Sequence, residues 1–151
     1  MEELLELRKC IEEQRYPDAL LLIGELEEMS REDKINKIYS YAVILLLHLI
    51  KQEAEQRSTR SWDFSVCNSV SQITVTNRRR KTGGVYVPHE ELRELLGEAY
   101  PLALKRAAME AFEGQFTETQ LEGKINPEHV REEAFRLIHE SLSGVKKISD
   151  K

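Results

Sequence analysis

Apolar positions along this chain recur mainly at intervals of three and four residues, the spacing that marks one side of a helix. In the first such segment, which carries acidic and basic residues on its opposite side, the apolar positions are Leu4, Leu5, Leu7 and Ile11. Pro17 and Asp18 interrupt the pattern, and Asp18 is a suitable N-cap for a second helix that reaches about residue 26. The chain therefore begins with two predicted helices separated by a turn.

A third helix is predicted over about residues 31–56 and is the longest in the chain. Ser30 followed by Asp33 resembles the pattern that caps a helix at its N-terminus. From Ile38 to Ile50 nearly every residue is apolar, whereas the stretches before and after it are polar. A helix that is apolar on all sides is buried on all sides. We therefore expect this segment to be the central element around which the other helices pack.

The next segment is predicted to be a helix followed by a loop. Ser58 and Ser61 are both available to cap a helix that carries Trp62. The β-branched end of that helix, residues 73–77, is expected to become extended chain. A basic loop is expected at about residues 77–88, where Gly83 and Gly84 permit a short hairpin or a mobile arm.

The last third of the chain again has the helical period. One helix is expected to open at Pro88, with a break or kink near Tyr100 because Gly97 and Pro101 flank that residue. The final helix is expected to begin at residues 126–127. Together the patterns predict an all-α fold, a multi-helix bundle around one buried central helix at about residues 31–56, in a single helical domain over residues 1–151.

The composition is that of a folded, soluble protein. Of the 151 residues, 40% are hydrophobic and 32% are charged, which is typical of globular domains. The longest apolar run, residues 38–50, is shorter than the about 18 residues of a membrane span. The acidic N-terminus does not have the form of a secretory signal. We therefore expect a cytoplasmic protein with no membrane partner, in which Cys10 and Cys67 are free thiols.

Positive charge is concentrated in one part of an acidic chain. The net charge is −5 at pH 7, yet residues 57–81 hold six basic residues and one acidic residue. Residues 1–56 hold 13 acidic and 7 basic residues, and residues 82–151 hold 13 acidic and 9 basic residues. The candidate anion- or partner-binding residues are the six bases of this basic island, Arg57, Arg60, Arg78, Arg79, Arg80 and Lys81.

The two ends of the basic island favour different roles. Arg57 and Arg60 are expected to pair with nearby acids such as Glu53 or Glu55 while Trp62 packs beneath them, because a guanidinium binds carboxylates and stacks on an indole. A face that binds anions is the alternative for these residues. Residues 78–81 are expected to form a partner surface, since four bases in a loop repel one another unless something negative lies near. A solvated loop whose charge only aids solubility is the alternative.

No catalytic, cofactor-binding or metal-binding motif is recognised. The chain has neither a G-x-x-x-x-G-K-[ST] phosphate loop nor a G-x-S-x-G elbow, and no Glu stands three residues before any of its four histidines. His48 lies inside the apolar segment and is interpreted as a core histidine whose ring nitrogens are hydrogen-bonded. We therefore expect no catalytic residue, cofactor or metal, and the enzyme class is not favoured.

Three stretches carry a family resemblance: HLIKQ…RSTRSW, ELRELLGEAYPLALKRAAMEA and INPEHVREEAFRLI. They resemble a bacterial family of small helical proteins known as domain of unknown function number 29, from about residue 25 to residue 138. The resemblance implies an all-α fold and transfers no activity. Its most specific positions, which we take as a candidate structural motif, are His48, Lys51, Ser61, Trp62 and Tyr100. Gln52 and the basic NRRRKTGGVYVP loop depart from the family pattern.

Three functional hypotheses follow. The first is a non-catalytic interaction module that uses its basic patch to bind an unknown protein or another anionic partner, with homodimer formation as an option. The second is a nucleic-acid-binding protein that uses residues 57–81, although the rest of the chain, with a net charge of −10, repels a phosphate backbone. The third is a helical nuclease or toxin-type enzyme that uses His48 with Arg57 or Arg60.

Overall fold

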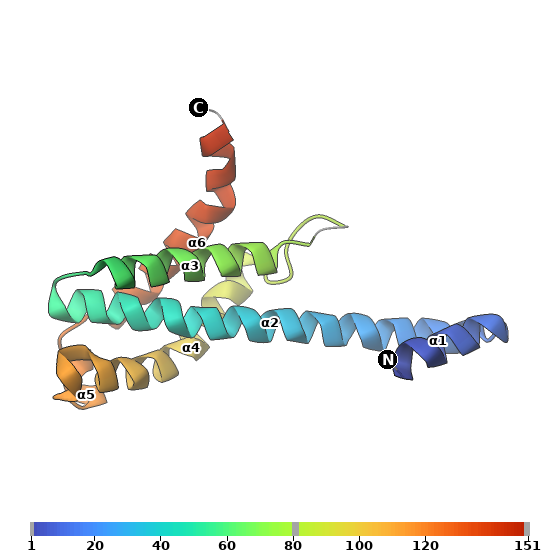
Figure 1. Ribbon diagram of the computed structural model, residues 1–151, viewed down its shortest axis with the longest axis horizontal. Coiled ribbons are helices and arrows are strands. Elements are labelled where there is room, and N and C mark those ends of the chain that lie inside the picture. The colour runs from blue at the N-terminus through green and yellow to red at the C-terminus, as the bar shows by residue number, and fades with distance from the viewer. Residues whose placement is uncertain (1, 80–81, 150–151) are drawn as a thin grey trace.

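The computed structural model describes residues 2–79 and 82–149 (Figure 1). Over these ranges the chain forms six α-helices and one short 3₁₀ helix, and it contains no β-strand. The elements in order are α1 (Glu2–Glu12), α2 (Tyr16–Glu55), α3 (Arg60–Asn77), α4 (His89–Glu110), η1 (Ala111–Gly114), α5 (Glu118–Glu122) and α6 (Pro127–Ser149). The predicted all-α bundle is confirmed.

The central helix is longer than the sequence pattern predicted. α2 has 40 residues and includes both the second and the third predicted helices, so the helix start expected after Ser30 is wrong. Residues 27–33, EEMSRED, contain no glycine or proline. Serine and aspartate inside a helix cost only a few tenths of a kcal/mol each, or about 0.7 at most, so nothing in this stretch stops the helix. α2 ends at Glu55 and is followed by the C-cap residue Gln56, whose φ of 51° is left-handed.

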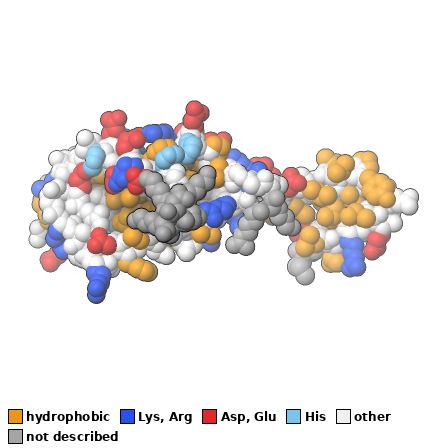
Figure 2. All heavy atoms as spheres, turned by 90° about the horizontal axis from the view of Figure 1, so that it is seen from above, with side chains coloured by type: hydrophobic (Ala, Val, Ile, Leu, Met, Phe, Trp, Pro, Cys, Tyr) orange, Lys and Arg blue, Asp and Glu red, His pale blue; other side chains and the backbone are white. Residues whose placement is uncertain are grey.

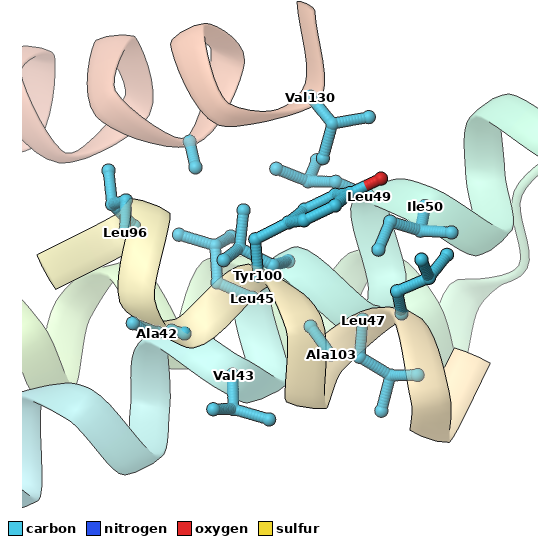
Figure 3. Close-up of a cluster of buried hydrophobic side chains, with 14 of the residues drawn as sticks. Ala42, Val43, Leu45, Leu47, Leu49, Ile50, Leu96, Tyr100, Ala103 and Val130 are labelled. Atoms are coloured by element: carbon cyan, nitrogen blue, oxygen red, sulfur yellow. The ribbon is translucent and has the colours of Figure 1, made fainter. Parts of the chain in front are cut away.

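The apolar half of α2 forms the centre of the core, as its pattern predicted. Ile38, Leu45, Leu46 and Ile50 have no exposed surface. Helices α3 and α4 both pack along this part of α2, and α6 closes the remaining side. Figure 3 shows α4 and α6 residues meeting this face of α2, among them Leu96, Tyr100, Ala103 and Val130. The enclosed half of α2 therefore sets the positions of α3, α4 and α6 around it.

Helix α3 differs from the expectation at both ends. The cap of α3 is Thr59, whose hydroxyl accepts the backbone N–H of Trp62 at 3.1 Å, and not Ser58 or Ser61. Its last residues stay helical through Asn77 where extended chain was expected. Ile73, Thr74, Thr76 and Asn77 are buried there, and this packing outweighs the weak β-preference of the side chains.

Beyond α3 the chain before residues 80–81 pairs with the chain after them, as expected for the short hairpin that was one of the two forms predicted for this loop. Arg78 and Val85 form an isolated antiparallel bridge. The N–H of Arg79 donates to the carbonyl of Gly84 at 3.0 Å, and the N–H of Tyr86 donates to the carbonyl of Asn77 at 2.9 Å. Gly83 and Gly84 have φ values of 74° and 76°, which glycine adopts without strain.

Helix α4 is continuous through Tyr100 and Pro101, so of the break or kink expected there the break is wrong. Pro101 lies inside the helix and cannot donate to the carbonyl of Gly97. The residues around it, Leu96, Ala99, Tyr100 and Ala103, are all buried. Tertiary packing of this face supplies more stability than one backbone hydrogen bond removes.

The N-terminal helix pair, which we define as α1 with residues 16–30 of α2, projects beyond the rest of the molecule (Figure 1). α1 folds back along α2, and Cys10 and Ala19 are buried between the two helices. Cys67, by contrast, is exposed. None of the described helices combines the length and the hydropathy of a membrane-spanning segment.

Candidate anion-binding groove

The basic island of the sequence is split in two by α3. Arg57 and Arg60 lie at the start of this helix, and Arg78 and Arg79 lie at its end. At about 1.5 Å per residue, the 18 residues of α3 separate the two ends by roughly 27 Å. The structure therefore does not bring these two groups of arginines together. Arg80 and Lys81 lie outside the described residues.

At the first end, the side chains are engaged with one another. The Nζ atom of Lys51 is buried, 3.0 Å from Oε1 of Glu110 and 4.6 Å from the ring centroid of Trp62. The guanidinium of Arg57 lies 4.7 Å from the same ring and pairs with Glu55 at 3.1 Å. Trp62 is half-buried between these cations. This arrangement matches the structural interpretation of Arg57 and Trp62.

Arg60 and Ser61 do not take part in that cluster. Both side chains are exposed in the first turn of α3. Within the described part of the chain no carboxylate lies at ion-pair distance from Arg60, although pairing with a nearby acid was expected for it. In the RSTRSW stretch, Arg57 stacks on the half-buried indole of Trp62 and Thr59 caps α3. The second arginine, Arg60, stays in solvent.

His48 and Tyr100, the other motif residues, are packing residues with unsatisfied polar atoms. Burial lowers the pKa of His48, the nearby charge of Lys51 lowers it further, and Glu110 opposes both effects. Nδ1 of His48 has no hydrogen-bond partner among the described residues, so the expected bonding is wrong for this atom. Burial raises the pKa of Tyr100 to about 12, with Glu122 adding to the effect and Arg131 opposing it.

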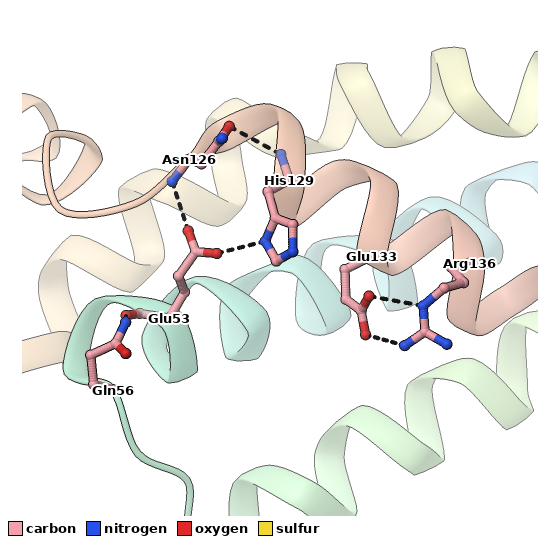
Figure 4. Close-up of polar contacts among 6 residues, drawn as sticks. All are labelled: Glu53, Gln56, Asn126, His129, Glu133 and Arg136. Atoms are coloured by element: carbon pink, nitrogen blue, oxygen red, sulfur yellow. Dashed lines mark hydrogen bonds and ion pairs between the residues drawn. The ribbon is translucent and has the colours of Figure 1, made fainter.

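A hollow between the end of α2 and the start of α6 is held by internal hydrogen bonds (Figure 4). Oε1 of Glu53 lies 2.7 Å from Nδ1 of His129, and Oε2 accepts the N–H of Asn126 at 2.7 Å. Asn126 in turn accepts the N–H of His129 through Oδ1 at 3.2 Å and so caps α6. Glu53 thus ties two helices together, and its oxygens are already occupied.

At the other end of α3, positive side chains line an open groove with a volume of about 660 Å³. Arg78 and Arg79 come from the turn after α3, and Lys34 and Lys37 come from the facing side of α2. The remaining lining residues are Glu27, Val75, Thr76, Thr82 and Tyr86. Two lysines from the acidic first third of the chain thus join two arginines of the basic island, and sequence reasoning missed them.

The backbone around the groove is well anchored. Asn77 is buried and bonds both polar groups of Val87: its Nδ2 donates to the carbonyl at 3.0 Å, and its Oδ1 accepts the N–H at 2.7 Å. The guanidinium of Arg79 lies 5.2 Å from the ring of Tyr86. These contacts fix residues 77 and 87 to each other and place Arg79 against Tyr86.

The four cations of this groove form no ion pair with any described residue. Within the described chain no carboxylate forms an ion pair with Lys34, Lys37, Arg78 or Arg79, while most other described arginines pair with an acid. Glu27 is the one acid in the lining. Four cations around one hollow repel each other, and an anion placed among them relieves that repulsion.

The fold places the chain in the class of all-α proteins built around one long buried helix. The chain belongs to the family described as Domain of unknown function DUF29, whose model matches residues 13–135. The family resemblance seen in the sequence is thereby confirmed. No curated protein and no solved structure matches the chain. The match leaves out all of α1, and the family description assigns no activity.

Proposed function

We propose that the protein is a non-catalytic interaction module that binds an acidic segment of a partner protein in the groove between α2 and the turn after α3. The observation that supports this proposal is the set of four cations, Lys34, Lys37, Arg78 and Arg79, which line one hollow beside a single acid, Glu27, and have no ion-pair partner among the described residues. Because arginine binds a carboxylate through two parallel hydrogen bonds, each arginine can hold one acidic side chain.

The electrostatics of the whole chain favour this location. The net charge is −5, so an anion is repelled by most of the surface and drawn to the groove. A hollow of about 660 Å³ is within the size of sites that take small ligands and suits a few side chains. Val75, which is 56% exposed, and Tyr86 add apolar contacts beside the charges.

A binding titration with matched variants tests the proposal. The probe is a fluorescein-labelled peptide of ten glutamates, followed by anisotropy at low and at physiological salt. The variant Arg78→Ala/Arg79→Ala removes two groove cations, whereas Lys105→Ala/Arg106→Ala removes two exposed cations on α4. We expect the groove variant to weaken binding by about tenfold or more, since charge-assisted hydrogen bonds are lost, and the control to stay within about twofold.

Equal losses in both variants would contradict the proposal, because binding would then follow net charge alone. A labelled single-stranded DNA of the same charge serves as the comparison ligand. If DNA binds more tightly than the peptide, and Arg57→Ala/Arg60→Ala weakens it as much as the groove variant does, the nucleic-acid hypothesis replaces this one.

A further inference from the structure

The N-terminal helix pair exposes more large apolar side chains than the rest of the described molecule. Seven of the eleven exposed large hydrophobic residues lie in it: Leu4, Leu5, Ile11, Tyr16, Leu20, Leu21 and Met29. Leu20 is 68% exposed and Leu4 is 57% exposed. Only Cys10 and Ala19 of the pair are buried. Scattered apolar residues on a surface are ordinary, but a group of this density on one projecting element marks an interaction surface.

Helix geometry places most of these residues on one side of the pair. α1 and α2 are antiparallel and face each other through Cys10 and Ala19. When two helices run antiparallel, each has a contact residue that faces the partner helix. The residues that directly follow these two contact residues point to the same side of the pair. Ile11 follows Cys10 and Leu20 follows Ala19, so both lie on one side. Leu4, seven residues before Ile11, and Tyr16, four before Leu20, extend the same two stripes.

Figure 2 shows the result, a continuous cluster of hydrophobic side chains on one face of the projecting helix pair. The acids of the pair lie mostly elsewhere. Glu6 and Glu13, at four residues before and three after Cys10, turn to the other side of α1, as Asp18 does on α2. Glu27, seven residues after Leu20, continues the stripe of α2 on this side, so the apolar face is bounded by charge at that end.

We propose that this face is covered by the same face of a second copy of the chain, so that two helix pairs form an antiparallel four-helix bundle. The face is about 20 Å long, from the rise of residues 16–30, and about 20 Å wide, from two helix diameters. Its projected area is therefore on the order of 400 Å², below the ~800 Å² per partner of a standard interface, so the expected dimer is one that dissociates on dilution. An isologous contact brings a face of two helices against an equal face and leaves none of it uncovered.

Ile11 and Leu20 do not line the groove, although Glu27 at the end of the helix pair does, so variants at Ile11 and Leu20 test the dimer without changing a groove residue. A partner with a basic amphipathic helix and a lipid surface are the other occupants of such a face. The purified full chain distinguishes them, since only self-association requires nothing else in solution.

Sedimentation velocity of the full chain from about 1 to about 100 μM, with no partner added, tests the proposal. We expect a dimer that dissociates on dilution. Ile11→Glu/Leu20→Glu places carboxylates in the contact and is expected to raise the dissociation constant by at least about 100-fold. Both sites are exposed in the single chain, so helix content by circular dichroism should not change. The control Phe64→Glu/Met109→Glu alters two equally exposed apolar residues outside the helix pair and should leave the dimer intact.

A parent chain that is monomeric at every concentration would overturn the proposal, whether or not it binds liposomes of mixed zwitterionic and anionic lipids. A dimer that dissociates in the Phe64→Glu/Met109→Glu control but persists in Ile11→Glu/Leu20→Glu would also overturn it, since the interface would then lie elsewhere. If the double variant loses helix content, the concentration dependence of the parent alone, together with Leu20→Gln, decides the question.

Discussion

Nζ of Lys51 lies 3.0 Å from a carboxylate oxygen of Glu110, which makes this pair the link between the end of α2 and the end of α4. The two partners have different surroundings: the side chain of Lys51 is 8% exposed and that of Glu110 is 47% exposed. Water therefore weakens the attraction from one side only. The indole of Trp62, 4.6 Å from the ammonium, closes the other side. The ammonium of Lys51 is tolerated beside the apolar core because the carboxylate of Glu110 and the ring of Trp62 both attract it.

Replacing Lys51 should therefore destabilise the fold. We expect Lys51→Ala to lower the free energy of unfolding by about 2–3 kcal/mol, because it removes a buried aliphatic stem and an ion pair that is half screened by solvent. Urea denaturation followed by circular dichroism measures the change. Lys105→Ala, at an exposed lysine of α4, is the control and should stay within about 0.5 kcal/mol. A loss for Lys51→Ala below about 1 kcal/mol would show that the pair is incidental.

The stability of the fold should depend on His48 in mildly acidic solution. Burial is the main cause that lowers the pKa of His48 in the folded chain, so the unfolded chain takes up this proton first. The stabilisation from a neutral His48 is present above the unfolded pKa of about 6.5 and is lost as the pH falls below it towards the folded pKa. Unfolding free energies at pH 7.5 and pH 5 should differ less in His48→Gln than in the parent.

The exposed His139 provides the control for that experiment. His139→Gln should retain the full loss of stability between the two pH values. If His48→Gln and the parent lose the same amount, the acid sensitivity arises from other groups, and His48 is not protonated differently in the two states.

The hydroxyl of Tyr100 should contribute nothing to stability. It is buried without a hydrogen-bond partner among the described residues, and its pKa is raised to about 12. Because an unpaired buried hydroxyl costs free energy, Tyr100→Phe should leave the free energy of unfolding unchanged or raise it by up to about 1 kcal/mol. Tyr100→Ala, which removes the whole ring, should cost about 3–5 kcal/mol. A loss above about 1 kcal/mol in Tyr100→Phe would mean that the hydroxyl is bonded.

Asn77 should control both the stability and the shape of the turn. Asn77→Ala leaves the N–H and the carbonyl of Val87, a buried residue, without their partners. We expect a loss of about 2–4 kcal/mol and faster hydrogen exchange at the Val87 amide. Thr82→Ala, an exposed change in the same turn, is the control. Unchanged exchange at Val87 in Asn77→Ala would show that the backbone alone holds the turn.

The helix boundaries show where sequence reasoning stopped being sufficient. The start predicted at residue 31 rested on Ser30 and Asp33, residues that suit a cap but also tolerate a helix interior. The extended chain predicted at residues 73–77 rested on β-branched side chains, and their burial against the rest of the fold decided otherwise. In the first case nothing in the exposed stretch 27–33 stops the helix, and in the second burial outweighed a weak local preference.

The candidate groove shows the same limit for function. Arg78 and Arg79 were recognised from their place in a basic, glycine-flanked loop. Lys34 and Lys37 were missed because they stand in an acidic stretch more than 40 residues away in sequence, and only the packing of α3 along α2 brings them to the same hollow. Arg57 and Arg60 were grouped with the loop because they carry the same charge and lie in the same stretch of sequence. A helix of 18 residues nevertheless holds them apart from it.

The sequence by itself determined that the chain is all-helical and that residues 38–50 form its centre, because the period of apolar residues and their presence on every side of one helix are local properties. The tertiary structure alone decided which polar groups meet: Lys51 with Glu110, Glu53 with His129, and four cations around one groove. It also decided that the apolar stripe of α1 remains exposed. These outcomes depend on how whole helices are placed, and distances between residues far apart in the chain are set by that placement and not by their spacing in the sequence.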